Sequence, residues 1–447
     1  MSALLQELVQ SVSCTVLTDP TDFDRYPEDD SEATPELPLA VLLAESTQDV
    51  STALAWANRH GVKVSVRGAG SGLAGGAVAY AGGLVLSVEK MTSLSLDPLA
   101  RLAVVGAGVI TADLDRAAQE HGLFFPPDPA SAAISTVGGN IATNAGGLRC
   151  LAHGVTADSV VALEVVLADG SVIHTGARTA KNVTGLNLTQ LFVGSEGTLG
   201  VITQATVRLK PVPEGDPATF SAHFDSFEEA TDTIIAIASS QEKPESLELV
   251  DAETATMIEK HHSRGLTIPK AAIVMGKTTG PRALEQAQAF AQRCAQGGAI
   301  ETAALPGLDL METRRLVHSA TIAEGYLVFG DTGVPLEKLS LFVAKIRELE
   351  AEYGRKVTIS AHAGDGNLHP AVYSADGEEG QAQAHELLDR IGLEALKLGG
   401  TVTGEHGIGS LKMQGMLEQL SPATLAAQRA IKAALDPNNI LTPGRAV

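Results

Sequence analysis

Glycine is gathered in three short segments of the N-terminal half, and these segments constrain the fold more than any other feature of the chain. They cover residues 68–72, 127–147 and 194–200 of a chain with 447 residues and 45 glycines. A glycine-rich turn exposes consecutive backbone N–H groups, which can bind a pyrophosphate or carbonyl oxygens. Because the excess of glycine is confined to such clusters, it indicates tight turns and ligand-binding loops and not a flexible linker.

Two histidine clusters near the C-terminal end form a candidate metal site. His362 and His369 flank a Gly-Asp-Gly turn, and Glu405 and His406 follow in a second glycine-rich segment. Two imidazoles and a carboxylate, with glycines around them, suit an open three-ligand metal site. We therefore expect His362, His369 and Glu405 to bind a divalent metal. Zn²⁺ is favoured, and Mn²⁺ or Fe²⁺ is left open.

Composition and charge narrow the class of protein. The chain is 44% hydrophobic and 19% charged, as in an ordinary globular enzyme, and its length suggests two or three domains. Its net charge of −21 argues against a nucleic acid partner, because phosphate recognition depends on Lys and Arg. The three cysteines give no disulfide framework, and no apolar run reaches the roughly 18 residues of a membrane span. We expect a cytoplasmic protein, with peripheral contact to a membrane left open.

The hydrophobic pattern predicts alternating strands and helices after an acidic, irregular segment at residues 1–36. Pro211 and Pro213 mark a domain boundary, after which the pattern suggests a second α+β module. The predicted helices cover residues 47–60, 112–121, 228–239, 284–296 and a tail from about 420. The predicted strands cover residues 41–43, 62–66, 84–87, 102–105, 160–167, 172–174, 205–209 and 271–275.

The glycine segments, in this order and spacing, resemble the FAD-binding domain shared by vanillyl-alcohol oxidase and the p-cresol methylhydroxylase (PCMH) flavoproteins. The histidine clusters and residues 438–444 resemble one branch of that superfamily. The branch contains the glycolate oxidase large subunit, D-lactate dehydrogenases and D-2-hydroxyglutarate dehydrogenases. The resemblance implies an α+β fold with a PCMH-type FAD-binding domain over 1–213. It also implies an α+β substrate (cap) domain with the metal site over 214–415, and a small C-terminal helical segment over 416–447 that returns to the FAD domain.

The resemblance also implies which residues bind FAD. The first segment would hold the pyrophosphate, the second would line the isoalloxazine side, and the third would lie near the phosphates and adenine. These residues are Arg67, Gly68, Ala69, Gly70, Ser71 and Gly72, then Ser131, Thr136, Gly138, Gly139, Asn140, Thr143 and Asn144, and finally Glu196, Gly197 and Ile202. No histidine occupies residues 68–76, where some relatives attach FAD covalently, so we expect FAD to be bound non-covalently.

Four further side chains are candidates for handling a 2-hydroxy acid substrate. A metal ion can chelate the hydroxyl and carboxylate oxygens of such an acid, and His406 is then the candidate base for the hydroxyl proton. By resemblance Arg314 would bind the substrate carboxylate, although an exposed basic pair with Arg315 is the alternative reading. Asn367 would orient substrate or flavin. His318 takes the place of a threonine of the hydroxyglutarate enzymes, one helical turn after the arginine, and is a further candidate for binding the substrate.

One difference from the hydroxyglutarate enzymes indicates what kind of tail the substrate has. Counting back from Pro335 without gaps, the lysine that grips the distal carboxylate of 2-hydroxyglutarate falls on Phe329. An apolar ring there favours a short 2-hydroxy acid such as D-lactate. We therefore expect FAD-dependent, metal-assisted oxidation of a small anionic D-2-hydroxy acid to the 2-oxo acid, with hydride passing to FAD.

Several alternatives are left open by the sequence. The protein could instead be a D-2-hydroxyglutarate dehydrogenase or the large subunit of a multi-subunit glycolate oxidase. Two readings of a different class are a flavin-binding structural subunit without chemistry of its own and a flavoprotein that catalyses a redox-neutral transfer. A quinone, a cytochrome, an electron-transfer flavoprotein or an Fe–S subunit would each serve as electron acceptor, and a homodimer is left open.

Overall fold

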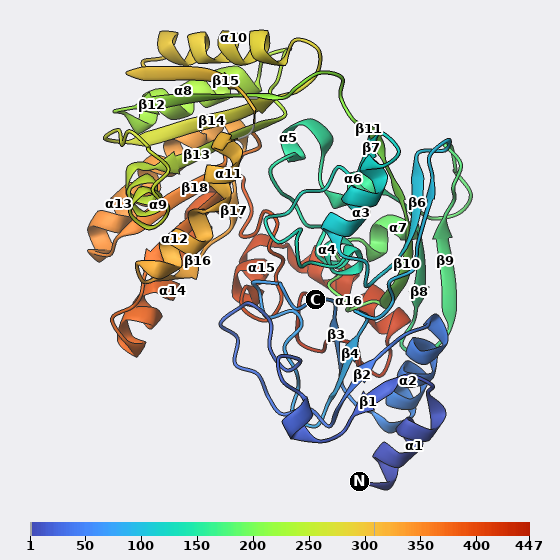
Figure 1. The fold of residues 1–447 in the computed structure, drawn as a ribbon. Coiled ribbons are helices and arrows are strands. Elements are labelled where there is room, and N and C mark those ends of the chain that lie inside the picture. Colours follow the sequence, from blue (N-terminus) through green and yellow to red (C-terminus); the bar gives the residue numbers. More distant parts are fainter. Residues whose placement is uncertain (1, 308) are drawn as a thin grey trace. The chain divides into compact units, whose positions relative to one another are not determined.

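The computed structural model describes residues 2–307 and 309–447, which divide into two compact units (Figure 1). Each unit has its own sheets and its own hydrophobic core. Unit 1 consists of Met1–Gly146, Gly154–Val212 and Glu405–Val447. Unit 2 consists of Gly147–His153 and Pro213–Gly404.

The first sheet of unit 1 is mostly parallel, and its parallel strands are largely buried. Its strands, in spatial order, are β1 (Thr15–Leu17), β2 (Ala40–Leu43), β4 (Leu84–Ser87) and β3 (Val64–Arg67). Only β1 pairs in the antiparallel sense. Helix α2 (Thr47–His60) begins with a capping box between Ser46 and Asp49 and ends at Gly61, whose φ is 65°. Strands buried on both faces are typically continuous apolar runs, and β2 is one.

The N-terminal segment departs from the predicted irregular structure. Residues 3–11 form helix α1 (Ala3–Ser11), capped by the Ser2 hydroxyl, which accepts from the backbone N–H of Leu5. Leu5 and Leu8 are buried against the core of unit 1, and β1 follows. The prediction missed this helix because the acidic composition of the whole segment outweighed a short apolar stripe with i, i+3 spacing.

The second sheet of unit 1 is antiparallel and carries the helices that follow the glycine segments. Its strands, in spatial order, are β5 (Leu94–Asp97), β6 (Leu102–Gly106), β10 (Val201–Arg208), β8 (Val160–Val166) and β9 (Val172–Gly176), while β7 (Leu123–Phe124) pairs with β11 (Lys210–Pro211). The helical segments of unit 1 besides α1 and α2 are η1 (Pro20–Asp22), α3 (Thr111–Gln119), α4 (Val137–Thr143), α6 (Thr156–Ser159), α7 (Leu188–Phe192), α15 (Met413–Gln419) and α16 (Pro422–Leu435).

Unit 2 is built on one antiparallel sheet covered by helices on both faces. Its strands, in spatial order, are β15 (Glu301–Pro306), β12 (Ala218–Phe224), β14 (Ala272–Thr278), β13 (Ser246–Asp251), β18 (Val357–His362), β19 (Asn367–Tyr373) and β16 (Tyr326–Phe329), with β17 (Thr332–Gly333) beside β19. The larger core lies under α8 (Phe227–Ala238), α10 (Ala283–Gln296), α13 (Leu339–Tyr353) and α14 (Glu378–Lys397). The smaller core lies under α9 (Ala252–His262), α11 (Asp309–Arg315) and α12 (Val317–Ala323). The remaining helical segments are α5 (Cys150–His153), which contacts β13, and η2 (Leu336–Lys338).

The predicted α+β architecture is confirmed. The helices predicted over 47–60, 112–121, 228–239 and 284–296 are α2, α3, α8 and α10, each within two residues at either end. Among the described residues, no helix has both the length and the apolarity needed to cross a membrane.

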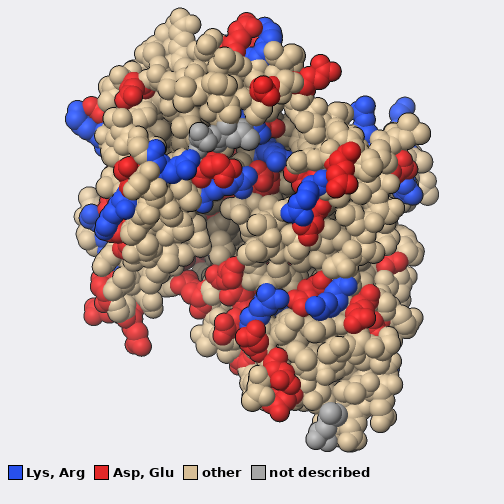
Figure 2. All heavy atoms as spheres, viewed as in Figure 1, with Lys and Arg blue, Asp and Glu red and all other residues tan. Residues whose placement is uncertain are grey.

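Charge is finely mixed on the surface that Figure 2 shows. On this face the basic side chains occur in small groups beside acidic ones, and the whole chain carries a net charge of −21. An anionic substrate is repelled by such an overall charge and therefore needs a local cationic group in its binding site.

Candidate functional site

A cavity of unit 1 brings the three glycine segments together. Residues of all three segments line it, and so do Glu405 and His406. Its volume is about 220 Å³. Of the residues predicted to bind FAD, Arg67 and Asn144 do not line the cavity and the others do.

Arg67 and Asn144 shape the cavity wall from behind. Arg67 ends β3, and its guanidinium donates to the carbonyl oxygens of Glu28 and Ala69 while lying directly under Gly70. Burial lowers the pKa of Arg67. Asn144 ends α4 in the left-handed region with φ of 53°, and its Oδ1 accepts from the backbone N–H of Ala157 at 2.8 Å. Both side chains therefore support the loops behind the cavity, and neighbouring residues line its wall.

The first glycine segment offers donors to a bound group. Within residues 2–307 and 309–447, no hydrogen-bond acceptor is found for the backbone N–H groups of residues 69–72, which line the cavity. An ideal Cβ placed on Gly72 meets no atom within 4 Å, so this wall faces open space. A row of backbone donors without protein acceptors suits the oxygens of a pyrophosphate. The residues present therefore fit the diphosphate part of a dinucleotide such as FAD.

Glu196 holds the segment that carries Glu405 and His406 onto the cavity wall. Its carboxylate accepts from the backbone N–H groups of Ile408 at 2.8 Å and Gly409 at 2.7 Å. Burial raises the pKa of Glu196. A Cβ at Gly146 would lie 2.4 Å from Oε2 of Glu405, so a larger residue at this position would displace the Glu405 carboxylate. The hydrogen bonds from Ile408 and Gly409 to Glu196 thus position the backbone of the segment that carries Glu405 and His406.

One face of the unit 2 sheet carries the candidate side chains of His362, His369 and Asn367. Side chains alternate between the faces of a sheet, so the cross-strand partners His362 and Asn367, and the partners Ser360 and His369, share one face. The imidazole rings of His362 and His369 lie 5.1 Å apart between centroids and nearly perpendicular, at 86°. The structure therefore brings together the two histidines that the sequence predicts as metal ligands.

A buried carboxylate links His362 to Arg314. The Nδ1 of His362 lies 2.9 Å from Oε2 and 3.1 Å from Oε1 of Glu248, and the Nε of Arg314 lies 3.0 Å from the same Oε2. Arg314 is only 8% exposed, whereas Arg315 is exposed. The alternative reading of these arginines as an exposed pair is therefore wrong for Arg314, which points into unit 2.

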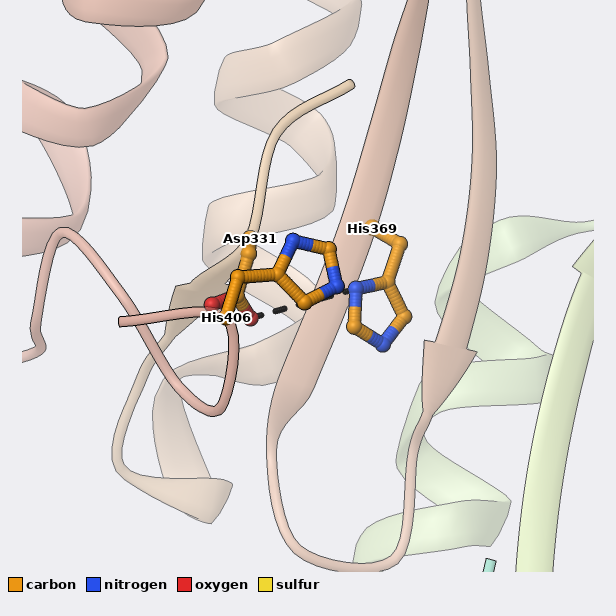
Figure 3. Close-up of side chains that lie close together, drawn as sticks. All are labelled: Asp331, His369 and His406. Atoms are coloured by element: carbon orange, nitrogen blue, oxygen red, sulfur yellow. Dashed lines mark ion pairs between the residues drawn. The ribbon is translucent and has the colours of Figure 1, made fainter. Parts of the chain in front are cut away.

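A second buried carboxylate lies beside His369. Asp331 follows β16, and its Oδ1 lies 3.8 Å from Nδ1 of His369, the ion pair drawn in Figure 3. Its Oδ2 accepts from the Thr403 hydroxyl at 2.6 Å and from the Gly404 backbone N–H at 2.9 Å. Asp331 therefore lies beside His369, one candidate metal ligand. It also anchors Gly404, the residue directly before Glu405, which is another candidate ligand.

Sequence reasoning missed Glu248 and Asp331. One signal for Glu248 was available, because it is a charged residue between Leu247 and Leu249 in a strand that is buried throughout.

His318 and Phe329, the two positions at which the sequence departs from the hydroxyglutarate enzymes, are in contact. The rings of His318 and Phe329 are 4.9 Å apart, and Phe329 pairs with Ala371, two residues beyond His369 on the same face.

Comparison with known families identifies the chain. A model described as FAD binding domain matches residues 38–176, and one described as FAD linked oxidases, C-terminal domain, matches residues 216–446. The chain belongs to the family of FAD-linked oxidases. The predicted resemblance and the prediction of an FAD-dependent oxidoreductase are therefore confirmed.

Similar proteins in this family cover the chain almost completely. The glycolate oxidase subunit GlcD of Bacillus subtilis (strain 168) is 39% identical over 429 residues, covering 93% of this chain and 90% of its own. A D-lactate dehydrogenase of Archaeoglobus fulgidus is 38% identical over 438 residues, covering 96% of each chain. The solved structure of p-cresol methylhydroxylase with substrate bound superposes with a TM-score of 0.81 at 17% identity, covering 100% of this chain and 97% of its own. That likeness confirms the PCMH-type fold.

Proposed function

We propose that this FAD-linked oxidase converts a D-2-hydroxy acid with a short apolar tail, such as D-lactate, to the 2-oxo acid with the help of a divalent metal. The observation that carries the proposal is the convergence of His362, His369 and Arg314 on one face of unit 2. Imidazoles suit a metal ion, and a buried guanidinium suits a carboxylate. A substrate with adjacent hydroxyl and carboxylate groups needs both.

His362, His369 and Glu405 would hold the metal, and Zn²⁺ suits their nitrogen and oxygen donors best. Glu248 lies 2.9 Å from Nδ1 of His362, which leaves Nε2 of that ring for coordination, and Asp331 lies 3.8 Å from Nδ1 of His369 as a nearby negative charge. Glu405 would complete the set, because the chain before it is anchored to Asp331 through Gly404. A divalent ion held by these residues would supply a Lewis acid that lowers the pKa of the substrate hydroxyl.

The backbone N–H groups of residues 69–72 would bind the pyrophosphate of FAD, and α4 with its flanking residues would line the flavin ring. Without a histidine in residues 68–76, FAD is held without a covalent bond. When bound there, FAD would supply the hydride acceptor for the substrate carbon. An external quinone, cytochrome or electron-transfer flavoprotein would then take up the electrons.

Three side chains would handle the substrate directly. Arg314 binds its carboxylate, because a guanidinium offers paired donors to two carboxylate oxygens. His406 accepts the hydroxyl proton, since an imidazole on the cavity wall is a suitable base. Asn367, whose buried Oδ1 has no hydrogen-bond donor within the described ranges, orients the bound acid or the flavin.

The apolar ring of Phe329 favours a substrate with a short tail. D-2-hydroxyglutarate is the alternative substrate if His318 binds its distal carboxylate. The glycolate oxidase subunit of Bacillus subtilis makes glycolate the other short candidate. We expect wild-type protein to oxidise D-lactate with a higher kcat/KM than D-2-hydroxyglutarate. Phe329→Lys should raise kcat/KM for D-2-hydroxyglutarate relative to D-lactate by about 10- to 100-fold, because a charged hydrogen bond contributes about 1.5–3 kcal/mol.

The matched control for this test is Leu327→Lys, on the same strand at an exposed position. It should leave the ratio of the two kcat/KM values at its wild-type level. A wild-type preference for D-2-hydroxyglutarate would favour the alternative substrate. An unchanged ratio in Phe329→Lys would show that this ring does not contact the substrate tail.

A further inference from the structure

We propose that Glu248 is a positioning residue that aims His362 at the metal and Arg314 at the substrate carboxylate, so that one buried side chain sets both halves of the binding site in unit 2. This inference rests on the proposed function, in which His362 is a metal ligand and Arg314 binds substrate. Glu248 lies outside every motif that the sequence suggests, and it would touch neither metal nor substrate itself.

The geometry places one carboxylate oxygen between two partners. Oε2 of Glu248 lies 2.9 Å from Nδ1 of His362 and 3.0 Å from Nε of Arg314. Glu248 is 1% exposed, so water does not compete for these contacts. Its partners reach it from different elements, because His362 ends the neighbouring strand β18 and Arg314 lies on α11. The carboxylate thus joins a strand and a helix that the sequence separates by about fifty residues.

The contact with His362 selects one form of its imidazole ring. An ionised carboxylate accepts hydrogen bonds and donates none, so Nδ1 of His362 must carry the hydrogen that faces Glu248. The lone pair of the neutral ring then lies on Nε2, which points away from Glu248. Metal-binding histidines are commonly held in this way, and loss of the outer partner typically weakens metal binding by about 10- to 100-fold.

The contact with Arg314 occupies one edge of its guanidinium. Glu248 faces Nε, while the two Nη groups, which carry four further N–H donors, extend beyond that edge. The contact is an ion pair of 3.0 Å, and within the described ranges the Nε–H has no hydrogen-bond acceptor, so Glu248 holds the guanidinium by charge and close packing. It also compensates the charge of a side chain that is only 8% exposed. Without Glu248, Arg314 would be a buried, uncompensated cation free to turn toward other acceptors.

The test substitutes Glu248→Gln, which keeps the shape of the side chain and removes its charge. Zn²⁺ is titrated calorimetrically into metal-free, FAD-loaded protein, and KM for D-lactate is measured on the metal-loaded protein. We expect the Kd for Zn²⁺ to rise about 10- to 100-fold. KM should rise at least fivefold as Arg314 loses its anchor. A variant with wild-type Kd and wild-type KM would overturn the inference.

Glu245→Gln is the matched control. Glu245 precedes the same strand, is 6% exposed and pairs with His153 and Lys277 instead of the candidate site. A purely structural role for buried carboxylates predicts similar changes in both variants. Positioning by Glu248 predicts a change in Kd and KM in Glu248→Gln and wild-type values in Glu245→Gln. Equal changes in the two variants would therefore contradict the inference.

Two further variants separate this inference from the proposed function. If wild-type protein and His362→Ala bind Zn²⁺ equally, the metal site itself is wrong. If His362→Ala loses the ion while Glu248→Gln keeps wild-type values, only the role of Glu248 is wrong. Should Glu248→Gln fail to fold, Glu248→Asp decides, because the charge remains but the shorter side chain cannot reach both partners. Glu248→Asp is expected to raise Kd or KM at least threefold, and wild-type values for both would overturn the inference.

Discussion

His369→Ala is expected to release the bound metal and to lower kcat for D-lactate oxidation by about 10³-fold. Polarisation of the substrate hydroxyl by a metal contributes several kcal/mol, and each 1.36 kcal/mol changes the rate tenfold. FAD content should remain at the wild-type level, because His369 belongs to unit 2 and the cavity predicted for FAD is lined by unit 1. The measurements are metal content by elemental analysis, flavin absorbance of the purified protein and steady-state kcat.

The matched control is His262→Ala, a half-buried histidine that ends α9 and lies 3.2 Å from the Ser319 hydroxyl, which should keep wild-type metal content and kcat. The decisive result of this test is loss of the metal without loss of FAD. Loss of both cofactors would indicate a folding defect and would call for comparison of the thermal unfolding of the variants. Metal content and kcat that both stay at the wild-type level in His369→Ala would contradict the proposed metal site.

His406→Asn is expected to lower the rate of flavin reduction by D-lactate by about 10²- to 10⁴-fold while FAD and metal stay bound. General base catalysis contributes a factor of that size, and asparagine has hydrogen-bonding groups but cannot accept a proton near neutral pH. The rate is measured anaerobically by stopped-flow flavin absorbance. Wild-type protein should lose rate as the pH falls, because a protonated imidazole cannot act as a base, and the variant should lack this dependence.

Two controls make the test of His406 specific. His121→Asn replaces an exposed histidine after α3 in unit 1 and should leave the rate unchanged. Added imidazole should restore part of the rate in His406→Asn, since it can enter the cavity and accept the proton. A variant that reduces flavin within threefold of the wild-type rate, with the wild-type pH dependence, would show that another group takes the proton.

Local signals in the sequence predicted those parts of the fold that depend on neighbouring residues. Helix α2 was recognisable from Ser46 at its start and Gly61 at its end, both of which perform their usual capping roles. The glycine segments likewise predicted ligand-binding loops, because glycine exposes backbone N–H groups and at some positions allows segments to approach closely. Gly68 is an example, since a Cβ there would collide with the Thr136 hydroxyl.

The parts of the candidate site that escaped prediction depend on which strands pair. Glu248 meets His362 only because β13 lies beside β18, and strand pairing over about a hundred residues leaves no pattern in a single sequence. Asp331 likewise reaches Gly404 across a long stretch of chain. The short segment Gly147–His153 packs in unit 2 although its neighbours on both sides belong to unit 1. Such contacts require the three-dimensional structure.

Anaerobic flavin reduction before and after metal removal tests the central claim most directly. Flavin absorbance of the purified protein is followed after addition of D-lactate, L-lactate, glycolate or D-2-hydroxyglutarate, then again after treatment with EDTA and after return of one equivalent of Zn²⁺ or Mn²⁺. The expected result is bleaching by D-lactate and not by L-lactate, loss of bleaching after EDTA, and recovery with one metal. Bleaching that survives complete metal removal, or no bleaching by any of these acids when FAD and metal are both bound, would contradict metal-assisted oxidation of a D-2-hydroxy acid.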